Sequence, residues 1–169
     1  MLSLKFCKVR NVRSPEKGHT TDAGIDFFVP NDFHEQEIYF GEDILIPSGI
    51  KAEIPEGYAL VQFNKSGVAT TEQLVVGACV IDEGYQGEIH LHVISVGEYL
   101  TKISPGMKIM QGLLLPVPQV TLVEMDKDDL FLEETERGEG GFGSTSELED
   151  KPIIEMAKEL SEFSYGGSK

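Results

Sequence analysis

Nine consecutive residues near the end of the chain combine groups that can bind a phosphorylated ligand. They read Arg137-Gly-Glu-Gly-Gly-Phe142-Gly143-Ser144-Thr145. Bare glycine amides can approach phosphates closely, an arginine can fork onto an anion, an aromatic ring can stack on a base, and hydroxyls can donate hydrogen bonds. Because such a segment cannot pack a core of its own, it is either a flexible linker or an arm that wraps a ligand.

Four upstream segments also combine glycines with charged or polar residues: 22–26, 65–67, 77–87 and 106–111. The segment 77–87 predicts a β-hairpin, with a turn at Glu83-Gly84 and a returning strand from Ile89. Lys65-Ser66-Gly67 is typical of a turn that opens a short helix, with Ser66 as its N-cap. It is not a phosphate-binding P-loop, because the glycine-rich stretch before the lysine is missing.

The elements that carry these segments are mostly predicted strands. Apolar and polar residues alternate over 2–6, 50–54 and 89–93, and this period of two indicates half-buried strands. Turn signals such as Pro47-Ser48-Gly49 recur about every ten residues. The combination predicts an all-β sandwich, jelly roll or β-barrel-like fold, in which 68–73 forms one short helical turn.

The composition bounds the class of protein. A chain of 169 residues is long enough for one domain with a real core and too short for two full-sized ones. Its 29 acidic and 14 basic residues give a formal net charge of −15, which disfavours nucleic acid as a partner. An acidic protein that binds a polyanion must gather its few cations locally or recruit a metal ion.

The cellular setting follows from apolar runs and cysteines. No apolar run approaches the roughly 20 residues of a membrane helix, and the first residues do not form a secretory signal. We therefore expect a cytoplasmic protein with no membrane partner, in which Cys7 and Cys79 are reduced thiols. A structural zinc site is not expected, because the sequence has no Cys/His cluster.

The last residues, 146–169, differ in character from the rest. An acidic stretch precedes Pro152, which suits the first turn of a helix. The apolar residues that follow recur at helical spacing and predict a short amphipathic helix: Ile153, Met156, Ala157, Leu160 and Phe163. Such a helix is marginal alone. We expect it to dock on its own assembly or, as the alternative, on a separate protein partner.

Together and in this order, the five segments resemble those of the trimeric dUTP diphosphatase (dUTPase) family. The resemblance implies a β-rich jelly-roll domain over 1–145, whose residues 137–145 form a closing arm, followed by an acidic extension at 146–169. It also implies a homotrimer with active sites at subunit interfaces, and Mg²⁺-dependent hydrolysis of dUTP to dUMP and pyrophosphate. That reaction limits uracil in DNA and supplies dUMP for dTMP synthesis.

The resemblance also assigns roles to single residues of the third and fourth segments. Asp82 would orient and deprotonate the water that attacks the α-phosphorus, and Gln111 would contact the α-phosphate and help to hold that water. Tyr85 would pack under the deoxyribose and exclude a ribose hydroxyl. The backbone at Gly77 and Ala78 would hydrogen-bond uracil. Taken alone, Asp82 is also typical of a polar turn, Tyr85 of an aromatic residue in the core, and Gln111 of a buried strand glutamine.

The remaining roles concern the phosphates and the metal. Asp26 would act on Mg²⁺ through water, because this ion takes its direct ligands largely from phosphates; a plain strand-end acid is the alternative. Lys65 stands where the family usually has arginine and lacks the planar fork, and 24 residues follow Thr145, where the family usually ends. The residues that would bind phosphate or cover uracil are Lys65, Ser66, Gly67, Arg137, Phe142, Gly143, Ser144 and Thr145.

Two other functions remain open from the sequence. A dCTP deaminase shares the implied fold and trimer and would release ammonia from dCTP. The complete glycine-rich arm with Phe142, and the segment that carries Asp82 and Tyr85, argue against it. A regulatory binding protein built on the same trimer would use the acidic tail as its contact. The near-complete set of catalytic residues argues against a loss of activity, although a binding role could be added to it.

Overall fold

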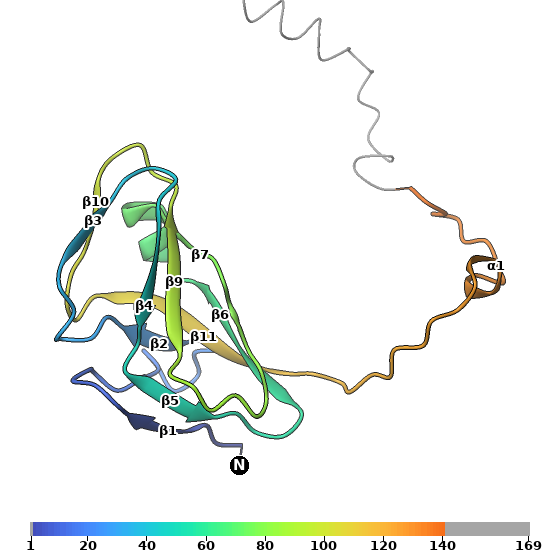
Figure 1. Cartoon of the computed structure of the whole chain (residues 1–169), viewed down its shortest axis with the longest axis horizontal. Helices are drawn as coiled ribbons and strands as arrows, with labels where there is room; N and C mark the ends of the chain where they lie inside the picture. Colours follow the sequence, from blue (N-terminus) through green and yellow to red (C-terminus); the bar gives the residue numbers. More distant parts are fainter. Residues whose placement is uncertain (1, 141–169) are drawn as a thin grey trace, which may run out of the picture. The chain divides into compact units, whose positions relative to one another are not determined.

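The computed structural model describes residues 2–140, which form a mostly β structure with two short helical turns (Figure 1). The turns are η1 (Val68–Glu72), a π-helical turn, and α1 (Lys127–Leu130). The strands in chain order are β1 (Lys5–Lys8), β2 (Ile25–Phe28), β3 (Gln36–Ile38), β4 (Asp43–Pro47), β5 (Ile50–Glu53), β6 (Tyr58–Asn64), β7 (Leu74–Val76), β8 (Val80–Ile81), β9 (His90–Ser95), β10 (Thr101–Ile103) and β11 (Lys108–Pro116).

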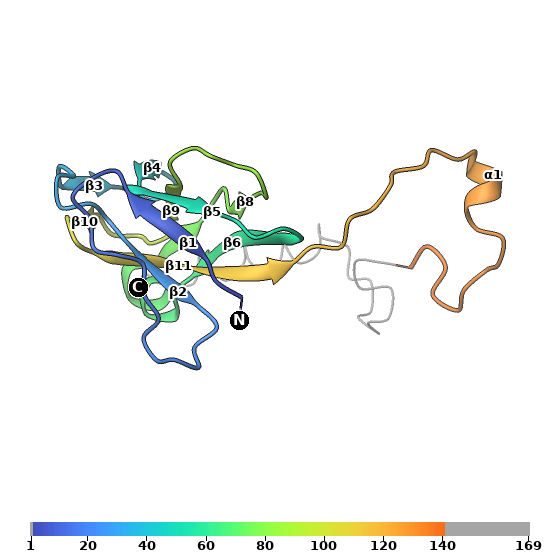
Figure 2. The same ribbon diagram turned by 90° about the horizontal axis from the view of Figure 1, so that it is seen from below.

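The strands pair antiparallel in two sheets and two ribbons. The larger sheet has the order β2-β11-β6-β8, the smaller one has the order β4-β9-β7, and β1 with β5 and β3 with β10 form the ribbons. In Figures 1 and 2, β4 and β9 lie on one side of the core and β2 and β11 on the other. The predicted all-β class is therefore confirmed.

The core lies between these layers, and the apolar residues of the alternating sequence pattern supply its side chains. On β9, Leu91 and Val93 are buried while His90 is exposed. Burying every second side chain on one face removes apolar surface from water, which is the main favourable contribution to folding. The predicted half-burial of the first strand is wrong, because Phe6 is 43% exposed. Within the described chain β1 pairs with β5 alone, and no opposite layer covers this face.

The predicted β-hairpin at the third segment is also wrong. β8 pairs with β6, whereas β9 pairs with β4 and β7, so the two strands belong to different sheets. Residues 77–89 instead form a long loop between β7 and β9, hereafter the Asp82 loop, and β8 attaches that loop to β6. Its turn contains Gly84 at φ +81°, as the predicted Glu83-Gly84 turn requires.

The helical turns match the sequence in part. η1 falls inside the predicted turn at 68–73. The single turn α1 was not predicted; it has Asp128 and Asp129 in its first turn, where the helix dipole favours negative charge.

The chain divides into two compact units, 1–121 and 122–169. The predicted boundary after residue 145 and the predicted helix of the tail lie outside the described residues and stay predictions. Among residues 2–140, no helix is both long and apolar enough to cross a membrane.

Candidate functional site

Asp26 on β2 is a buried carboxylate held between two lysines. Its side chain is 5% exposed, and its oxygens lie 2.8 Å from Lys65 Nζ and 2.7 Å from Lys108 Nζ. Burial alone raises the pKa of Asp26, but the hydrogen bonds from Lys108 and Lys65 outweigh it, so the pKa lies below its ordinary value. The acid is therefore ionised, and it holds two cations at one end of the larger sheet.

Gln111 on β11 joins the same cluster. It lies opposite Asp26 in the β2–β11 ladder and opposite Phe63 in the β6–β11 ladder. Its Nε2 donates to the carbonyl of Asn64, 2.9 Å away, which directly precedes Lys65. A Cβ at Gly24 would overlap the Gln111 carboxamide, so a larger residue there would displace the Gln111 side chain. The structure thus brings the first, second and fourth predicted segments together.

The Lys65-Ser66-Gly67 segment opens η1, but not as the sequence suggested. The N-cap is Gly67, and no side chain caps the turn. The predicted N-cap role of Ser66 is therefore wrong. Its carbonyl instead accepts a hydrogen bond of 2.8 Å from Thr70 Oγ1. Ser66 and Gly67 are both exposed beside Lys65, where a ligand could reach them.

The Asp82 loop borders a separate hollow of about 350 Å³. Gln62 is buried on β6. Its side-chain Nε2 donates to the carbonyl of His90, and its backbone N–H donates to the carbonyl of Cys79. Tyr85 Oη donates to the carbonyl of Glu88, which fixes its ring against the loop. The hollow is lined by Leu45, Gln62, Ala78, Cys79, Val80, Ile81, Asp82, Tyr85 and His90.

Gly77 and Ala78 lie at the entry of this loop, and only Ala78 lines the hollow. The Gly77 amide donates to the carbonyl of His92, and the Ala78 amide donates to His92 Nδ1 at 2.7 Å. Both amides are thus already used within the protein. A contact from these two residues to a base would have to come from their carbonyl oxygens.

The two groups of predicted residues flank opposite sides of β6. Ile81 pairs with Leu60, so Asp82 follows toward Ala59, whereas Gln111 pairs with Phe63. Four residues along a strand and two strand spacings separate the backbones of Asp82 and Gln111 by about 16 Å. One small reacting group cannot contact both within about 3 Å. A single chain therefore does not assemble the predicted site.

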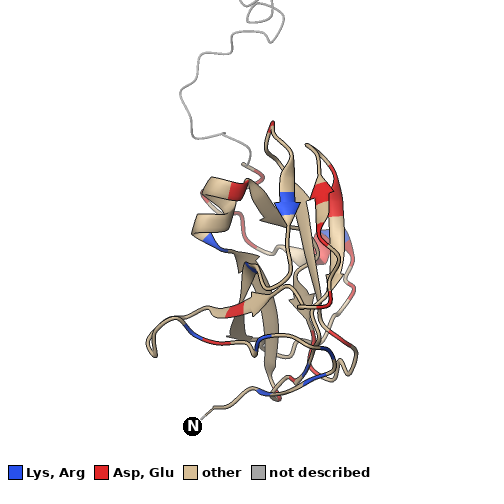
Figure 3. Cartoon of the chain, turned by 90° about the vertical axis from the view of Figure 1, so that its left-hand side faces the viewer, with Lys and Arg blue, Asp and Glu red and all other residues tan. Residues whose placement is uncertain are grey.

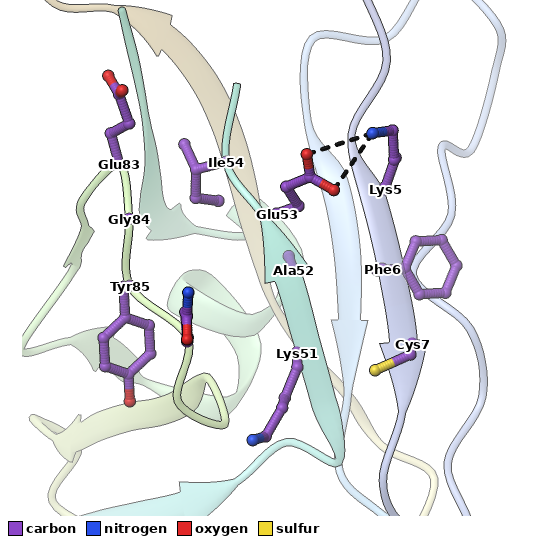
Figure 4. Close-up of a pocket in the computed structure, with 11 residues that line it drawn as sticks. Lys5, Phe6, Cys7, Lys51, Ala52, Glu53, Ile54, Glu83, Gly84 and Tyr85 are labelled. Carbon is purple, nitrogen blue, oxygen red and sulfur yellow. Dashed lines mark hydrogen bonds and ion pairs between the residues drawn. The ribbon is translucent and has the colours of Figure 1, made fainter. Parts of the chain in front are cut away.

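A larger open groove, of about 640 Å³, lies between β1, β5 and the turn of the Asp82 loop. Figure 4 shows the Lys5–Glu53 ion pair on its β1–β5 side and Tyr85 on the opposite side. Phe6 points away from the groove in this view. The groove shares Tyr85 with the smaller hollow, but it contains neither Asp82 nor Gln111.

The fifth segment belongs to the second unit and is described only as far as residue 140. Arg137 Nε donates to the carbonyl of Gly140, 3.0 Å away, across a turn in which Gly138 has φ +48°. The other predicted residues of the arm lie outside the described range: Phe142, Gly143, Ser144 and Thr145.

Acidic side chains outnumber basic ones about two to one within residues 2–140, and only some of them are paired. Lys102 pairs with Glu35 and Glu37, and Figure 3 shows basic and acidic positions interspersed over one face. Within residues 2–140, no group of three or more His, Cys, Asp or Glu side chains is placed to hold a metal ion. Lys65 and Lys108 gather two cations around the Asp26 carboxylate, and Lys108 also lies 4.0 Å from Glu16.

Sequence reasoning missed several residues of the Asp26 cluster and of the hollow beside the Asp82 loop. Lys108 lies within the fourth predicted segment, and a buried acid in need of partners was the signal that could have found it. Gln62, Cys79 and His90 line the hollow, and His92 contacts the loop entry. Cys79 lies within the third predicted segment. No local signal places Gln62, His90 and His92 beside this loop, because their neighbours come from distant parts of the chain.

A family model described as dUTPase matches residues 10–146, a range that includes all five segments. The chain belongs to the dUTPase family. It is 37% identical to the deoxyuridine 5'-triphosphate nucleotidohydrolase of Alkaliphilus metalliredigens over 86% of this chain and 98% of that protein. For the protein of the same name from Gloeothece citriformis, the identity is 38% over 88% and 100% of the two chains.

A solved structure agrees with this family assignment. The dUTPase of Staphylococcus bacteriophage 80alpha, a G164S mutant with dUpNHpp, superposes with a TM-score of 0.73 at 26% identity. The match covers 86% of this chain and 99% of the phage chain. The β architecture described above is therefore that of a dUTPase subunit.

Proposed function

We propose that the protein is a dUTP diphosphatase, which hydrolyses dUTP to dUMP and pyrophosphate. The proposal rests chiefly on the dUTPase family match over residues 10–146, which includes every predicted site residue. The two named relatives, which are deoxyuridine 5'-triphosphate nucleotidohydrolases, support the substrate and the reaction. In a cell this activity would limit uracil in DNA and supply dUMP for dTMP synthesis.

The chemical step is an in-line attack of water on the α-phosphorus. Asp82 accepts the proton of the water as its oxygen bonds to phosphorus. The bond from the α-phosphorus to the bridging oxygen breaks, and pyrophosphate leaves with that oxygen. Gln111 donates to an α-phosphate oxygen without adding charge. Lys65 and Ser66 stabilise the charge that develops on the leaving group.

The assembly that performs this step is a homotrimer with sites between subunits. The support is the separation of Asp82 and Gln111 on opposite sides of β6 within one chain. A second subunit that places its Asp82 loop beside the Asp26–Lys65–Gln111 cluster would complete the site. Arg137, Phe142, Gly143, Ser144 and Thr145 would then close over the nucleotide as an arm of the 1–145 domain.

Mg²⁺ is the cofactor that this chemistry requires. Both oxygens of Asp26 already pair with lysines, so the residues fit an ion held mainly by the phosphates, with Asp26 acting through water. When bound, the ion neutralises charge on the triphosphate.

Discrimination among nucleotides follows from the Asp82 loop. Tyr85, fixed by its hydrogen bond to Glu88, would pack under the deoxyribose and leave no room for a 2′-hydroxyl. The hollow of about 350 Å³ that Ala78 and Tyr85 border would take the base. Selection for uracil would come from the backbone of the loop.

The deciding experiment measures pyrophosphate release from dUTP, UTP, dTTP and dCTP, with and without Mg²⁺. We expect release from dUTP alone, and only with the metal. Ammonia release from dCTP would instead identify a deaminase. Turnover of none of the four would overturn the proposal and favour a regulatory binding protein.

A further inference from the structure

One histidine holds the first residues of the Asp82 loop, Gly77 and Ala78, in position. His92 lies in the middle of β9, with its side chain 22% exposed. Its Nδ1 accepts a 2.7 Å hydrogen bond from the Ala78 amide, and its Nε2 lies 2.9 Å from Asp43 Oδ2 on β4. The ring therefore connects two neighbouring strands to the loop.

These contacts determine which ring nitrogen carries the proton. A backbone amide can only donate, so Nδ1 must be an unprotonated acceptor. The proton of the neutral ring is therefore on Nε2, which donates it to the Asp43 carboxylate. Asp43 thus selects the one neutral tautomer that can hold the Ala78 amide.

The ring also sets the backbone path sterically. The carbonyl of His92 accepts a 3.0 Å hydrogen bond from the Gly77 amide, and a Cβ at position 77 would overlap the His92 ring. The backbone at Gly77 therefore lies directly against the imidazole of His92, and a residue with a side chain at position 77 would overlap that ring.

We propose that His92, oriented by Asp43, is a positioning residue for the nucleotide-binding hollow. It holds Ala78, which lines that hollow together with Cys79 and Asp82. The proposal rests on the proposed dUTP hydrolysis, and it adds that nucleotide affinity depends on the hydrogen-bond acceptor at Nδ1 of this ring.

Few other titratable groups face this ring. Asp43 faces it from β4, and β7 contributes none, since its residues are Leu74, Val75 and Val76. His90, on the same strand, and the loop residues Cys79, Asp82 and Tyr85 border the adjoining hollow. Among the described residues, Asp43 is thus the titratable group within hydrogen-bonding distance of this ring.

The test compares two substitutions of His92 by steady-state kinetics. His92→Asn keeps an acceptor close to the position of Nδ1, whereas His92→Leu removes it. We expect His92→Leu to raise KM for dUTP roughly fivefold, the worth of one hydrogen bond, with kcat nearly unchanged. His92→Asn should recover most of the loss. His34→Leu is the matched control, because His34 is exposed and lies outside both the Asp26 cluster and the hollow beside the Asp82 loop.

The split between KM and kcat separates positioning from a merely structural role. A folding defect would lower kcat through the amount of active enzyme, whereas a displaced Ala78 raises KM. Equal KM values for the wild type and His92→Leu, or no recovery in His92→Asn, would overturn the proposal.

A readout without substrate keeps this inference separate from the proposed function. Nitrogen-15 NMR of the nucleotide-free protein should show His92 protonated at Nε2 and the Ala78 amide shifted by its hydrogen bond, and His92→Leu should remove that shift. Proton placement on Nδ1 would overturn the inference even if dUTP is hydrolysed. In addition, Gly77→Ala should lower Tm strongly, and His92→Ala should relieve that loss.

Discussion

Asp82 and Gln111 lie on opposite sides of strand β6, about 16 Å apart through the backbone. Both are predicted to contact the same water molecule. If both contact that water, they must come from different subunits, and this proposed arrangement can be tested by mixing inactive chains.

Mixed trimers of Asp82→Asn and Gln111→Ala should regain activity. Each homotrimer lacks one group at every site, but a mixed trimer contains sites with Asp82 from one chain and Gln111 from another. With equal mixing, about one quarter of sites are intact, so activity should reach about one quarter of wild type. The measurement is pyrophosphate release after the two variants are unfolded together and refolded. No recovery would place both residues in one chain.

Asp82→Asn by itself should fold and bind dUTP but turn it over about 10²–10⁴-fold more slowly, because the amide cannot accept the proton of the attacking water. Single-turnover kinetics and calorimetric binding check both parts. Asp32→Asn, at an exposed acid outside the site, is the control. Near wild-type turnover of Asp82→Asn would show that another group is the base.

Asp26→Asn should reduce the dependence of stability on pH. Burial raises the pKa of Asp26, but Lys108 and Lys65 lower it further, so the folded pKa lies below the unfolded one. This contribution to stability is present above the unfolded pKa and is lost as pH falls through the folded value. Thermal unfolding between pH 6 and pH 3 should therefore show a shallower acid loss in the variant. An unchanged slope would mean that the lysines do not hold this acid in solution.

Removal of Mg²⁺ by a chelator should abolish turnover while leaving the fold intact. Within residues 2–140 no side-chain cluster holds a metal ion, so no structural contribution from one is expected there. Circular dichroism and pyrophosphate release, measured on the same sample before and after addition of Mg²⁺, check both statements. Loss of the β signal on chelation would contradict the proposed phosphate-held ion.

Deletion of 146–169 should leave dUTP hydrolysis largely intact, because every predicted site residue precedes Ser146. Light scattering of the truncated protein gives the second readout. If the trimer dissociates on truncation, the tail has a structural role in assembly; if activity falls while the trimer persists, the tail acts on the closing arm.

The sequence alone was sufficient for the fold class and for the family. Alternation at 89–93 predicted which residues of β9 are buried, and the turn at Gly84 required a residue that tolerates positive φ. These signals are local, since they depend on the period of one strand or the φ of one residue. The five segments likewise indicated the dUTPase family without any knowledge of their contacts.

Only the tertiary structure decided how these pieces meet. It placed β8 and β9 in different sheets, paired Asp26 with both Lys65 and Lys108, and set Ala78 on the ring of His92. Strand pairing and ion pairing join residues that are distant in sequence. The alternation of one strand shows which face is buried, but it carries no information about the neighbouring strand.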